Sequence, residues 1–232
     1  WAITHRKRPD VGGNEFFYLS EERVREVGIP AGCLQPLIPS PRYLKFFTFT
    51  KEDWDEIRKA GAECYLFLCH MPRNQLPESV RKYIQMGEGP SAAIRLRRRP
   101  GEPAGRPVSE SQASQTRRQH KDLFFDWYDL GDIRPVKVFA SYYARYWHRF
   151  VYAVDINIAL DADLVAFIPR EGLELSEIEY KALLAYLNSS IARLYMELQG
   201  RTAGGVAVLA LEADVLLNMP ILDVKKASKD VV

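Results

Sequence analysis

The sequence contains few cysteines and no long hydrophobic run. Three of its 232 residues are cysteines, Cys33, Cys64 and Cys69. An odd and sparse set favours free thiols in a reducing compartment over a framework of disulfides. No apolar stretch approaches the roughly 20 residues that a membrane-spanning helix requires, and we find no signal-peptide pattern. We therefore expect a cytoplasmic protein.

A strong excess of charge of one sign is also absent. The 32 lysines and arginines nearly balance 30 aspartates and glutamates, for a formal net charge of +2. The charge of the whole chain therefore indicates no particular partner, and any basic surface must be local. With 47% hydrophobic and 27% charged residues, the chain has the composition of an ordinary globular protein. It opens on Trp1 instead of Met, so we expect it to be part of a longer polypeptide.

Several motifs of catalytic domains are missing. The sequence has no Walker loop and no GxGxxG nucleotide fingerprint. It also lacks a GxSxG elbow and the Asn/Asp-Pro-Pro-aromatic motif with which amino-methyltransferases grip a flipped base. Cys64, Cys69 and His70 lie close together, but their spacing is loose and no second ligand pair follows, which argues against zinc.

One enzymatic alternative comes from the acidic residues. Asp161 or Asp163, followed by Glu179 and Lys181, superficially fits the pattern of metal-dependent nucleases. However, Ser176 and Glu179 have the spacing of a capping box, in which each side chain satisfies a free backbone N–H at the start of a helix. We therefore favour a structural role for Glu179 and keep the nuclease as the weaker alternative.

The most regular pattern lies between residues 176 and 222. Seven apolar residues recur at intervals of three and four, as on one buried face of a single amphipathic helix: Tyr180, Leu183, Leu184, Leu187, Ile191, Leu194 and Leu198. Gly200 should end this helix in a left-handed conformation. A buried strand is predicted over 206–211, followed by a helical turn over 212–217 that Pro220 ends.

The remaining pattern alternates short strands with short helices. Strands are predicted at 44–49, 65–69, 124–128, 136–139, 151–154 and 164–168, and helices over 20–28, 52–59 and 76–86. We predict an α/β fold of the α+β kind, in which helices pack on a mixed, largely antiparallel sheet. It would form a single domain over 1–222, with a tail over 223–232.

A long basic loop is predicted over about 87–123. Its segment from 95 to 121 carries eight basic residues against Glu102 and Glu110: Arg95, Arg97, Arg98, Arg99, Arg106, Arg117, Arg118 and Lys121. The scarcity of balancing acidic residues favours contacts with phosphates. A merely solvated linker remains the alternative.

A second notable stretch is SYYARYWHRF, residues 141–150, in which Arg145 and Arg149 alternate with aromatic residues. Packing in a sheet explains most of the aromatic residues. The arginines suit phosphates and base edges, because the guanidinium group is planar.

Taken together, four segments resemble a known family. They are GGNEFFYLSEERVREVGIP, LQPLIPSPRYLKFFTFT, FFDWYDLGDIRP and LLAYLNSSIARLYMELQGRTAGGVAVLALEADVLLNMPIL. In this order they are similar to the TaqI-like C-terminal specificity domain, the target-recognition region of adenine-specific DNA methyltransferases and of fused restriction–modification enzymes. The resemblance covers roughly residues 11–60 and 124–222, whereas residues 61–123 depart from it.

The resemblance implies a module that holds double-stranded DNA against a catalytic methyltransferase domain of the same polypeptide. The adenine grip and the S-adenosylmethionine pocket would lie N-terminal to Trp1. We therefore expect this chain to bind DNA without methylating it, and to hold neither a cofactor nor a metal itself.

Within this hypothesis, the basic residues position the duplex and the aromatic-rich stretch reads it. The predicted phosphate contacts are Arg42, Lys45, Arg97, Arg98, Arg99, Arg117, Arg118 and Lys121. The predicted base contacts are Tyr142, Tyr143, Arg145 and Arg149, with Arg201 and Thr202 as further candidates. The competing hypothesis is a protein-interaction domain that docks a partner subunit, which the near-neutral charge would suit.

Overall fold

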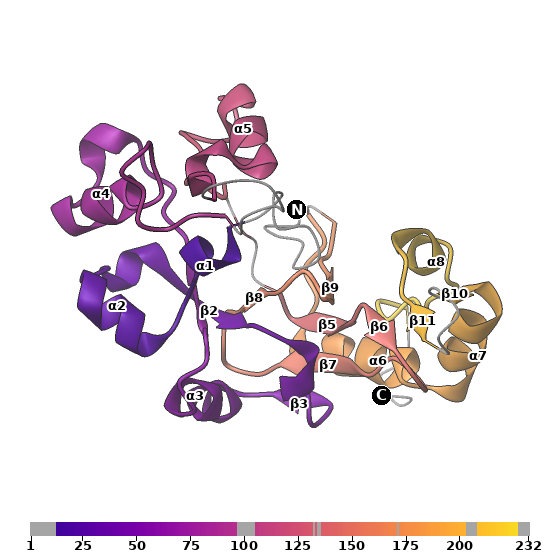
Figure 1. Ribbon diagram of the computed structural model, residues 1–232. Helices are drawn as coiled ribbons and strands as arrows, with labels where there is room; N and C mark the ends of the chain where they lie inside the picture. The colour runs from indigo at the N-terminus through magenta and orange to yellow at the C-terminus, as the bar shows by residue number, and fades with distance from the viewer. Residues whose placement is uncertain are drawn as a thin grey trace. The chain divides into compact units, whose positions relative to one another are not determined.

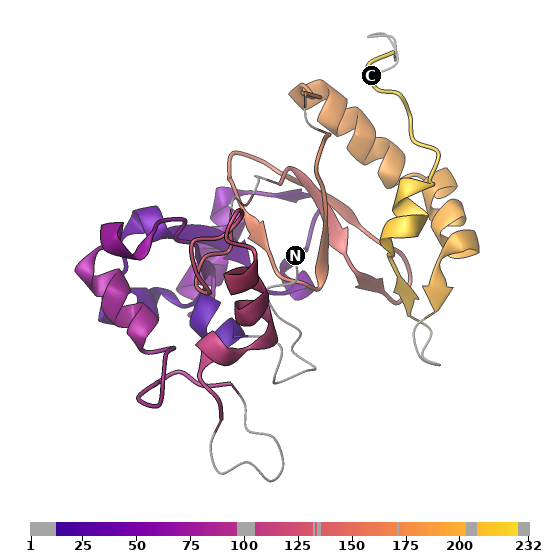
Figure 2. The same ribbon diagram turned by 90° about the horizontal axis from the view of Figure 1, so that it is seen from above.

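A computed structural model describes residues 13–96, 105–131, 133, 136–170, 172–202 and 208–226. The chain divides into two compact units, which we describe separately (Figures 1 and 2). Unit 1 consists of Trp1–Pro39 and Trp54–Arg134, and unit 2 of Ser40–Asp53 and Pro135–Val232. Both mix helices with sheets, which confirms the predicted α/β class. Among the described residues, no helix is long and apolar enough to cross a bilayer.

Unit 1 is built on a small antiparallel sheet. Strand β4 (Tyr65–Phe67) lies between β1 (Tyr18–Leu19) and β2 (Leu34–Ile38). The helices of this unit are α1 (Asn14–Phe17), α2 (Glu21–Val27), α3 (Lys51–Lys59, from Trp54 on), α4 (Glu78–Gln85) and α5 (Gln112–Gln119). Short 3₁₀ turns lie at Ala31–Cys33, Arg73–Gln75 and Val108–Glu110. As predicted, α2 begins at Ser20, whose hydroxyl accepts the Arg23 N–H, and ends at the left-handed Gly28.

The core of unit 1 is aromatic. Phe16 stacks on Tyr83 with 4.6 Å between ring centroids, and the Tyr83 hydroxyl donates to the Phe16 carbonyl at 2.5 Å. Trp127 lies against the other side of this cluster, 4.8 Å from Phe16. Gly87 lets the chain pass close by, because a Cβ there would lie 2.7 Å from the Trp127 ring. The start of the predicted basic loop, at Gly87, therefore packs against this core.

Two segments of unit 1 differ from the sequence prediction. Residues 112–119, which were predicted to be loop, form α5, because the Ser111 side chain accepts the Ser114 N–H at the helix start. Residues 124–128, which were predicted to be a strand, form turns. There the buried carboxylate of Asp129 accepts the N–H groups of Phe125 and Gly131, both at 2.8 Å, and fixes the turn instead.

The main sheet of unit 2 has four strands in the order β3-β7-β5-β9. Their bounds are β3 (Thr48–Phe49), β7 (Phe150–Ala153), β5 (Val138–Ser141) and β9 (Leu164–Phe167). Only the β3–β7 pair is parallel, so the sheet is mixed and largely antiparallel, as predicted. Strand β8 (Ala159–Leu160) and the 3₁₀ turn Pro41–Tyr43 also belong to this unit.

Helix α6 (Glu177–Leu187) lies along β7, where Tyr180 approaches Tyr152 (Figure 1). Helices α7 (Ser190–Gln199) and α8 (Ala213–Leu217) also belong to unit 2. Their residues share one buried cluster with the sheet, formed by Val138, Ala140, Phe150, Tyr152, Leu187, Ala192, Met196, Leu211 and Met219.

The single helix predicted over residues 176–199 is wrong, because the chain breaks it into α6 and α7. Asn188 ends α6 and turns its side chain to β7, where it accepts the Phe150 N–H at 3.1 Å and donates to the Phe150 carbonyl at 3.0 Å. Ser189 then caps α7 by accepting the Ala192 N–H. The capping box of Ser176 and Glu179 at the start of α6 is confirmed.

The break changes which apolar residues are buried. Ile191, Leu194 and Leu198, which were predicted to lie on the buried face, are 70%, 56% and 71% exposed. Ala192 and Met196 take their place in the core. Gly200 does end α7, but with an extended backbone (φ −71°) in place of the predicted left-handed one. A glycine fits here because a Cβ would lie 2.4 Å from the Met196 carbonyl oxygen.

A second, small sheet joins the ends of this helical region to the preceding strands. Its order is β10 (Arg201–Thr202), β11 (Leu209–Ala210) and β6 (Tyr143–Ala144), and both pairs are antiparallel. Residues 203–207, part of the predicted strand over 206–211, lie outside the described residues.

Candidate nucleic-acid interface

The small sheet brings together the two stretches that were predicted to read bases. Ala210 of β11 lies opposite Arg201 on one side and opposite Tyr143 on the other. Residues that are directly opposite in a sheet project from the same face, so the Arg201 and Tyr143 side chains flank the small Ala210 on one face. Residues 58 positions apart in the sequence (201 − 143) thus form one surface.

Both side chains of this row reach the solvent. Tyr143 is 45% exposed, and its ring meets that of Tyr142 edge-on, with centroids 4.6 Å apart. The Arg201 side chain is 74% exposed and pairs with Glu212 at 2.7 Å. Exposed ion pairs are weak, so Glu212 orients this guanidinium group without preventing it from binding a ligand. Thr202 and Arg145 are also exposed.

Arg149, the other arginine of the aromatic-rich stretch, has a different position. Its Nη1 donates to the Leu44 carbonyl at 3.1 Å and to the Lys45 carbonyl at 2.6 Å. Its guanidinium group also lies over the Phe47 ring, 5.6 Å from the centroid. Arg149 therefore holds the backbone of the segment that carries Lys45, instead of pointing to a base. As a consequence, the exposed residues Arg42 and Lys45 lie on a segment bonded to the aromatic-rich stretch.

The predicted phosphate contacts of unit 1 fall into three groups. Arg117 is 8% exposed, donates to the Trp127 carbonyl at 2.7 Å and lies over the Phe17 ring. Burial lowers the pKa of Arg117 to about 10, so the group stays charged at neutral pH but faces the core. Arg118 and Lys121 are exposed, and Arg118 pairs with Asp126 at 3.1 Å. Residues 97–99, the third group, lie outside the described residues.

Sequence reasoning missed three side chains beside the small sheet. Tyr146 and Trp147 follow β6 and are 76% and 46% exposed. Arg193 of α7 lies over the Trp147 ring, 4.8 Å from the centroid. Both aromatic residues lie in the run 141–150, which the sequence analysis noted. Arg193 could not be placed beside them, because the hydrophobic periodicity does not reveal the break between α6 and α7.

His148 lies beneath these residues. It is 1% exposed, and its Nε2 lies 3.3 Å from the Tyr142 carbonyl. Burial lowers the pKa of His148, although the backbone groups of Tyr142 and Leu209 oppose this effect. At neutral pH the imidazole is therefore neutral, and it adds no charge to the interior behind the surface.

Glu179 and Lys181, the second half of the pattern on which the nuclease hypothesis rests, are engaged in other contacts. Glu179 accepts the backbone N–H of Ser176 at 2.6 Å, and this bond is the main reason that its pKa falls to about 2. Lys181 pairs with Glu177 at 2.7 Å, one helical turn away. Across the parts of the chain that the structure describes, no group of three or more His, Cys, Asp or Glu side chains could hold a metal ion.

Comparisons with known proteins agree with the resemblance seen in the sequence. Residues 11–99 match the family model of the C-terminal domain of the Type II methyltransferase M.Eco57I. Over 224 residues, the chain is 26% identical to "Type II methyltransferase M.AccI" from Acinetobacter calcoaceticus. Together, the two matches support a C-terminal domain of a restriction–modification methyltransferase.

The extent of these matches adds two facts. The family match continues through residues 61–99, a segment that the sequence resemblance did not include. The alignment with M.AccI takes in 95% of this chain but 36% of the relative. The chain thus spans little more than a third of the length of this curated relative.

Proposed function

We propose that the chain is the DNA target-recognition domain of an adenine-specific methyltransferase of a restriction–modification system. The observation that carries this proposal is the row Arg201–Ala210–Tyr143 on the small sheet, which presents a cation and an aromatic ring on one face. Arginine can bind the edge of guanine with two hydrogen bonds, which contribute about 1–3 kcal/mol of discrimination against other bases. The relatives named above are Type II methyltransferases, and such enzymes need a part that selects the sequence.

The proposed base contacts are Tyr142, Tyr143, Arg145, Arg201 and Thr202. Arg42 and Lys45 would contact phosphates beside them, because Arg149 ties their segment to the same stretch. Arg97, Arg98, Arg99, Arg118 and Lys121 remain proposed phosphate contacts of unit 1. Arg117 and Arg149 are left out of the contact set, since their guanidinium groups bind backbone carbonyls. These two arginines would position other residues.

The catalytic steps belong, in this proposal, to a methyltransferase domain of the same polypeptide. S-adenosylmethionine would bind there, since the printed sequence has neither the GxGxxG fingerprint nor the motif that grips a flipped base. This chain would contribute duplex binding and sequence selection. A reducing, cytoplasmic setting suits its three free and buried cysteines.

The first test is a titration of fluorescent duplex DNA with the purified chain at several salt concentrations. Phosphate contacts release counterions, so the logarithm of the binding constant should fall linearly with the logarithm of salt concentration, by about 0.9 per contact. A flat response to salt would refute the phosphate contacts.

The second test concerns Arg201. Arg201→Ala should reduce discrimination at one base pair of a selected site by about 1–3 kcal/mol. Arg25→Ala is the matched control, because Arg25 is 76% exposed and also pairs with a glutamate, Glu21, at 2.8 Å. Equal effects of the two substitutions on base preference would contradict a reading role for Arg201.

A docking domain is the second candidate, and the exposed face of α7 favours it. Ile191, Leu194 and Leu198 form an apolar stripe on that helix, and exposed apolar patches often mark protein interfaces. Reversing the charges of Arg97, Arg98 and Arg99 discriminates the two functions. If the chain recognises DNA, the reversal should cripple duplex binding. If the chain is a docking domain, duplex binding should be negligible even without the reversal, and subunit assembly should stay largely intact after it.

A further inference from the structure

We propose that Phe46 inserts between two base pairs of the bound duplex and kinks the DNA at that step. Phe46 lies in unit 2, between the 3₁₀ turn Pro41–Tyr43 and β3, and its side chain is 63% exposed. Large apolar side chains, phenylalanine among them, act in DNA-binding proteins as wedges that part neighbouring base pairs. This inference rests on the proposed function, because it requires a duplex bound to unit 2.

The backbone on both sides of Phe46 is held in place. On one side, Arg149 Nη1 donates to the carbonyl of Lys45 at 2.6 Å. On the other side, the Phe47 carbonyl accepts the Tyr152 N–H at 2.9 Å, where β3 begins to pair with β7. The exposed ring is therefore carried on a fixed support. A side chain that is already in place loses less freedom on binding, so more of its contact energy is available to separate stacked bases.

The charge around Phe46 suits an anionic duplex. Residues 40–51 contain no acidic residue and three cations, Arg42, Lys45 and Lys51. Residues 136–153, which run from the start of β5 to the end of β7 with the stretch between them, also contain no acidic residue. Asp163 precedes β9, at the opposite edge of the main sheet from β3. An apolar ring with cations beside it in the chain thus fits a polymer whose outer surface is lined by phosphates.

The strand register places Phe46 near the proposed reading surface. Since β3 runs parallel to β7 and β5 runs antiparallel to it, the starts of β3 and β7 lie at the same end of the main sheet as the end of β5. The chain leaves β5 at Ser141 and enters β6 at Tyr143, which belongs to the row that also holds Arg201. Two strand spacings, about 10 Å, separate β3 from β5. One short duplex can therefore contact the row and Phe46 together.

The two kinds of contact would use different grooves of the duplex. Apolar wedges enter from the minor groove, whereas the guanine edge proposed for Arg201 lies in the major groove. The phosphate backbone between the two grooves would then face Arg42 and Lys45. A wedge also selects sequence without a hydrogen bond to any base, because the pyrimidine–purine steps TA and CA/TG are the most easily kinked. The recognised site should therefore contain such a step.

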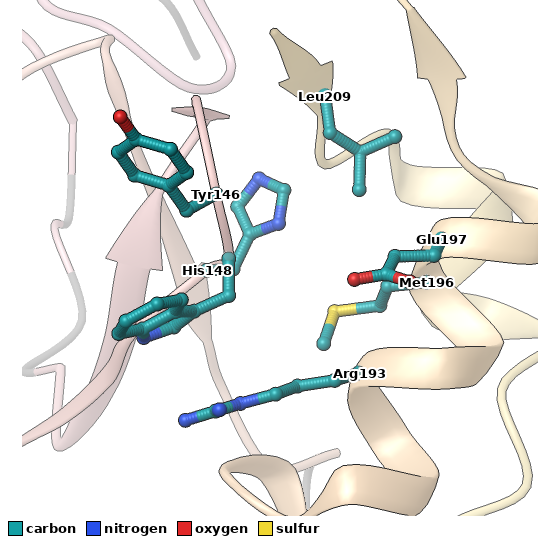
Figure 3. A pocket seen from close by; sticks show the side chains of 7 residues that line it. Tyr146, His148, Arg193, Met196, Glu197 and Leu209 are labelled. Atoms are coloured by element: carbon teal, nitrogen blue, oxygen red, sulfur yellow. The ribbon is translucent and has the colours of Figure 1, made fainter. Parts of the chain in front are cut away.

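Tyr146 is the other strongly exposed ring to consider as a wedge, since it is 76% exposed. It lines a small pocket together with Arg193 and Glu197 of α7 (Figure 3). Glu197 is exposed, and its carboxylate would repel the phosphates that flank a parted step. The tyrosine hydroxyl would also lose its hydrogen bonds to water on insertion. Phe46 carries no polar group and lies in a segment without a carboxylate, so it is the better wedge.

The experiment starts from a duplex that the purified chain selects out of a random pool. Each adenine is replaced singly by 2-aminopurine, whose fluorescence is quenched by stacking and rises when a neighbouring base moves away. Every TA or CA/TG step contains an adenine, so each of these steps can be tested. Binding of the chain should raise the fluorescence at one such step. It should also bend the duplex by about 20–90°, measured by energy transfer between dyes at the two ends.

Three variants connect the effect to Phe46. Phe46→Ala should abolish both the rise in fluorescence and the bend, while circular dichroism shows an intact fold, because the ring is exposed. The salt dependence of binding should keep its slope, since no cation is removed. Phe46→Leu should retain the rise, because leucine also acts as a wedge. Tyr146→Ala is the matched control, an exposed aromatic residue of unit 2 outside the Phe46 segment, and should retain both signals.

Two results would overturn the proposal while leaving the proposed function standing. One is salt-dependent duplex binding in which the fluorescence rises at no 2-aminopurine position. The other is a rise that Phe46→Ala leaves unchanged. Absence of any duplex binding would refute the proposed function, and the wedge with it.

Discussion

Replacing Asn188 should show how much of the stability of the protein comes from contacts between the helices and the sheet, as distinct from local helix capping. Its amide accepts the Phe150 N–H, donates to the Phe150 carbonyl, and donates to the Leu184 carbonyl at 2.9 Å. Phe150 is fully buried, so Asn188→Ala would leave one donor and one acceptor of its backbone without a partner. At about 1–3 kcal/mol for each of these two groups, we expect a loss of about 2–6 kcal/mol in the free energy of unfolding.

The chain offers a matched control in Asn218. Like Asn188, it ends a helix, and its side-chain amide donates to the carbonyl four residues earlier, that of Asp214, at 2.8 Å. This bond is exposed, and among the described residues no hydrogen bond to a strand accompanies it. Asn218→Ala should therefore cost less than about 1 kcal/mol. The difference between the two variants isolates the contacts with β7.

Urea denaturation followed by circular dichroism measures the loss of stability. Hydrogen exchange of a peptide that includes Phe150 reports the local effect, because the N–H of Phe150 should exchange faster once its acceptor is removed. The reasoning would be refuted if Asn188→Ala destabilised the protein no more than Asn218→Ala, or if exchange at Phe150 remained as slow as before.

Three further predictions concern other parts of the chain. Arg117→Met should lower the free energy of unfolding by about 1–3 kcal/mol, since the Trp127 carbonyl loses its buried donor, while the salt dependence of DNA binding should stay unchanged. Gly87→Ala should cost about 1–3 kcal/mol in a thermal melt, because its Cβ would press on the Trp127 ring. The pKa of Glu179 is lowered to about 2, mainly by the Ser176 N–H; its stabilisation is thus complete above about pH 4.5 and disappears as the pH falls towards 2. An acid titration of the melting temperature should show this decline in the native chain and a smaller one in Glu179→Gln.

Helix ends that are fixed by residues close in the sequence were predicted correctly. Ser20 and Gly28 bound α2, and the box of Ser176 and Glu179 starts α6, as expected. These predictions succeed because a cap requires only residues within one helical turn. The strands of the main sheet were also found, within a few residues, from their apolar runs.

The errors have a common origin in contacts between distant residues. The apolar periodicity continues from α6 into α7, but Asn188 binds Phe150, 38 positions earlier, and this contact breaks the helix. Similarly, residues 124–128 have the apolar character of a strand, but the buried Asp129 binds their backbone and the His70 side chain, and so holds them in turns. A single sequence does not show which distant partner an Asn or Asp side chain will find.

In the candidate interface, too, the role of each arginine depends on a partner that is distant in the sequence. Sequence reasoning treats Arg117, Arg149 and Arg201 alike, since each lies in a stretch that suits nucleic acid. In the structure, the first two donate to backbone carbonyls, and Arg201 has the half-buried carboxylate of Glu212 as its partner. The Trp127 carbonyl is buried with Arg117 and would be left unpaired if this donor turned to a ligand. Arg149 binds two carbonyls at once, whereas Arg201 pairs with the partly exposed Glu212, which can be solvated when Arg201 turns to DNA. The partner of each arginine, more than its place in a basic stretch, therefore decides whether it can read a base.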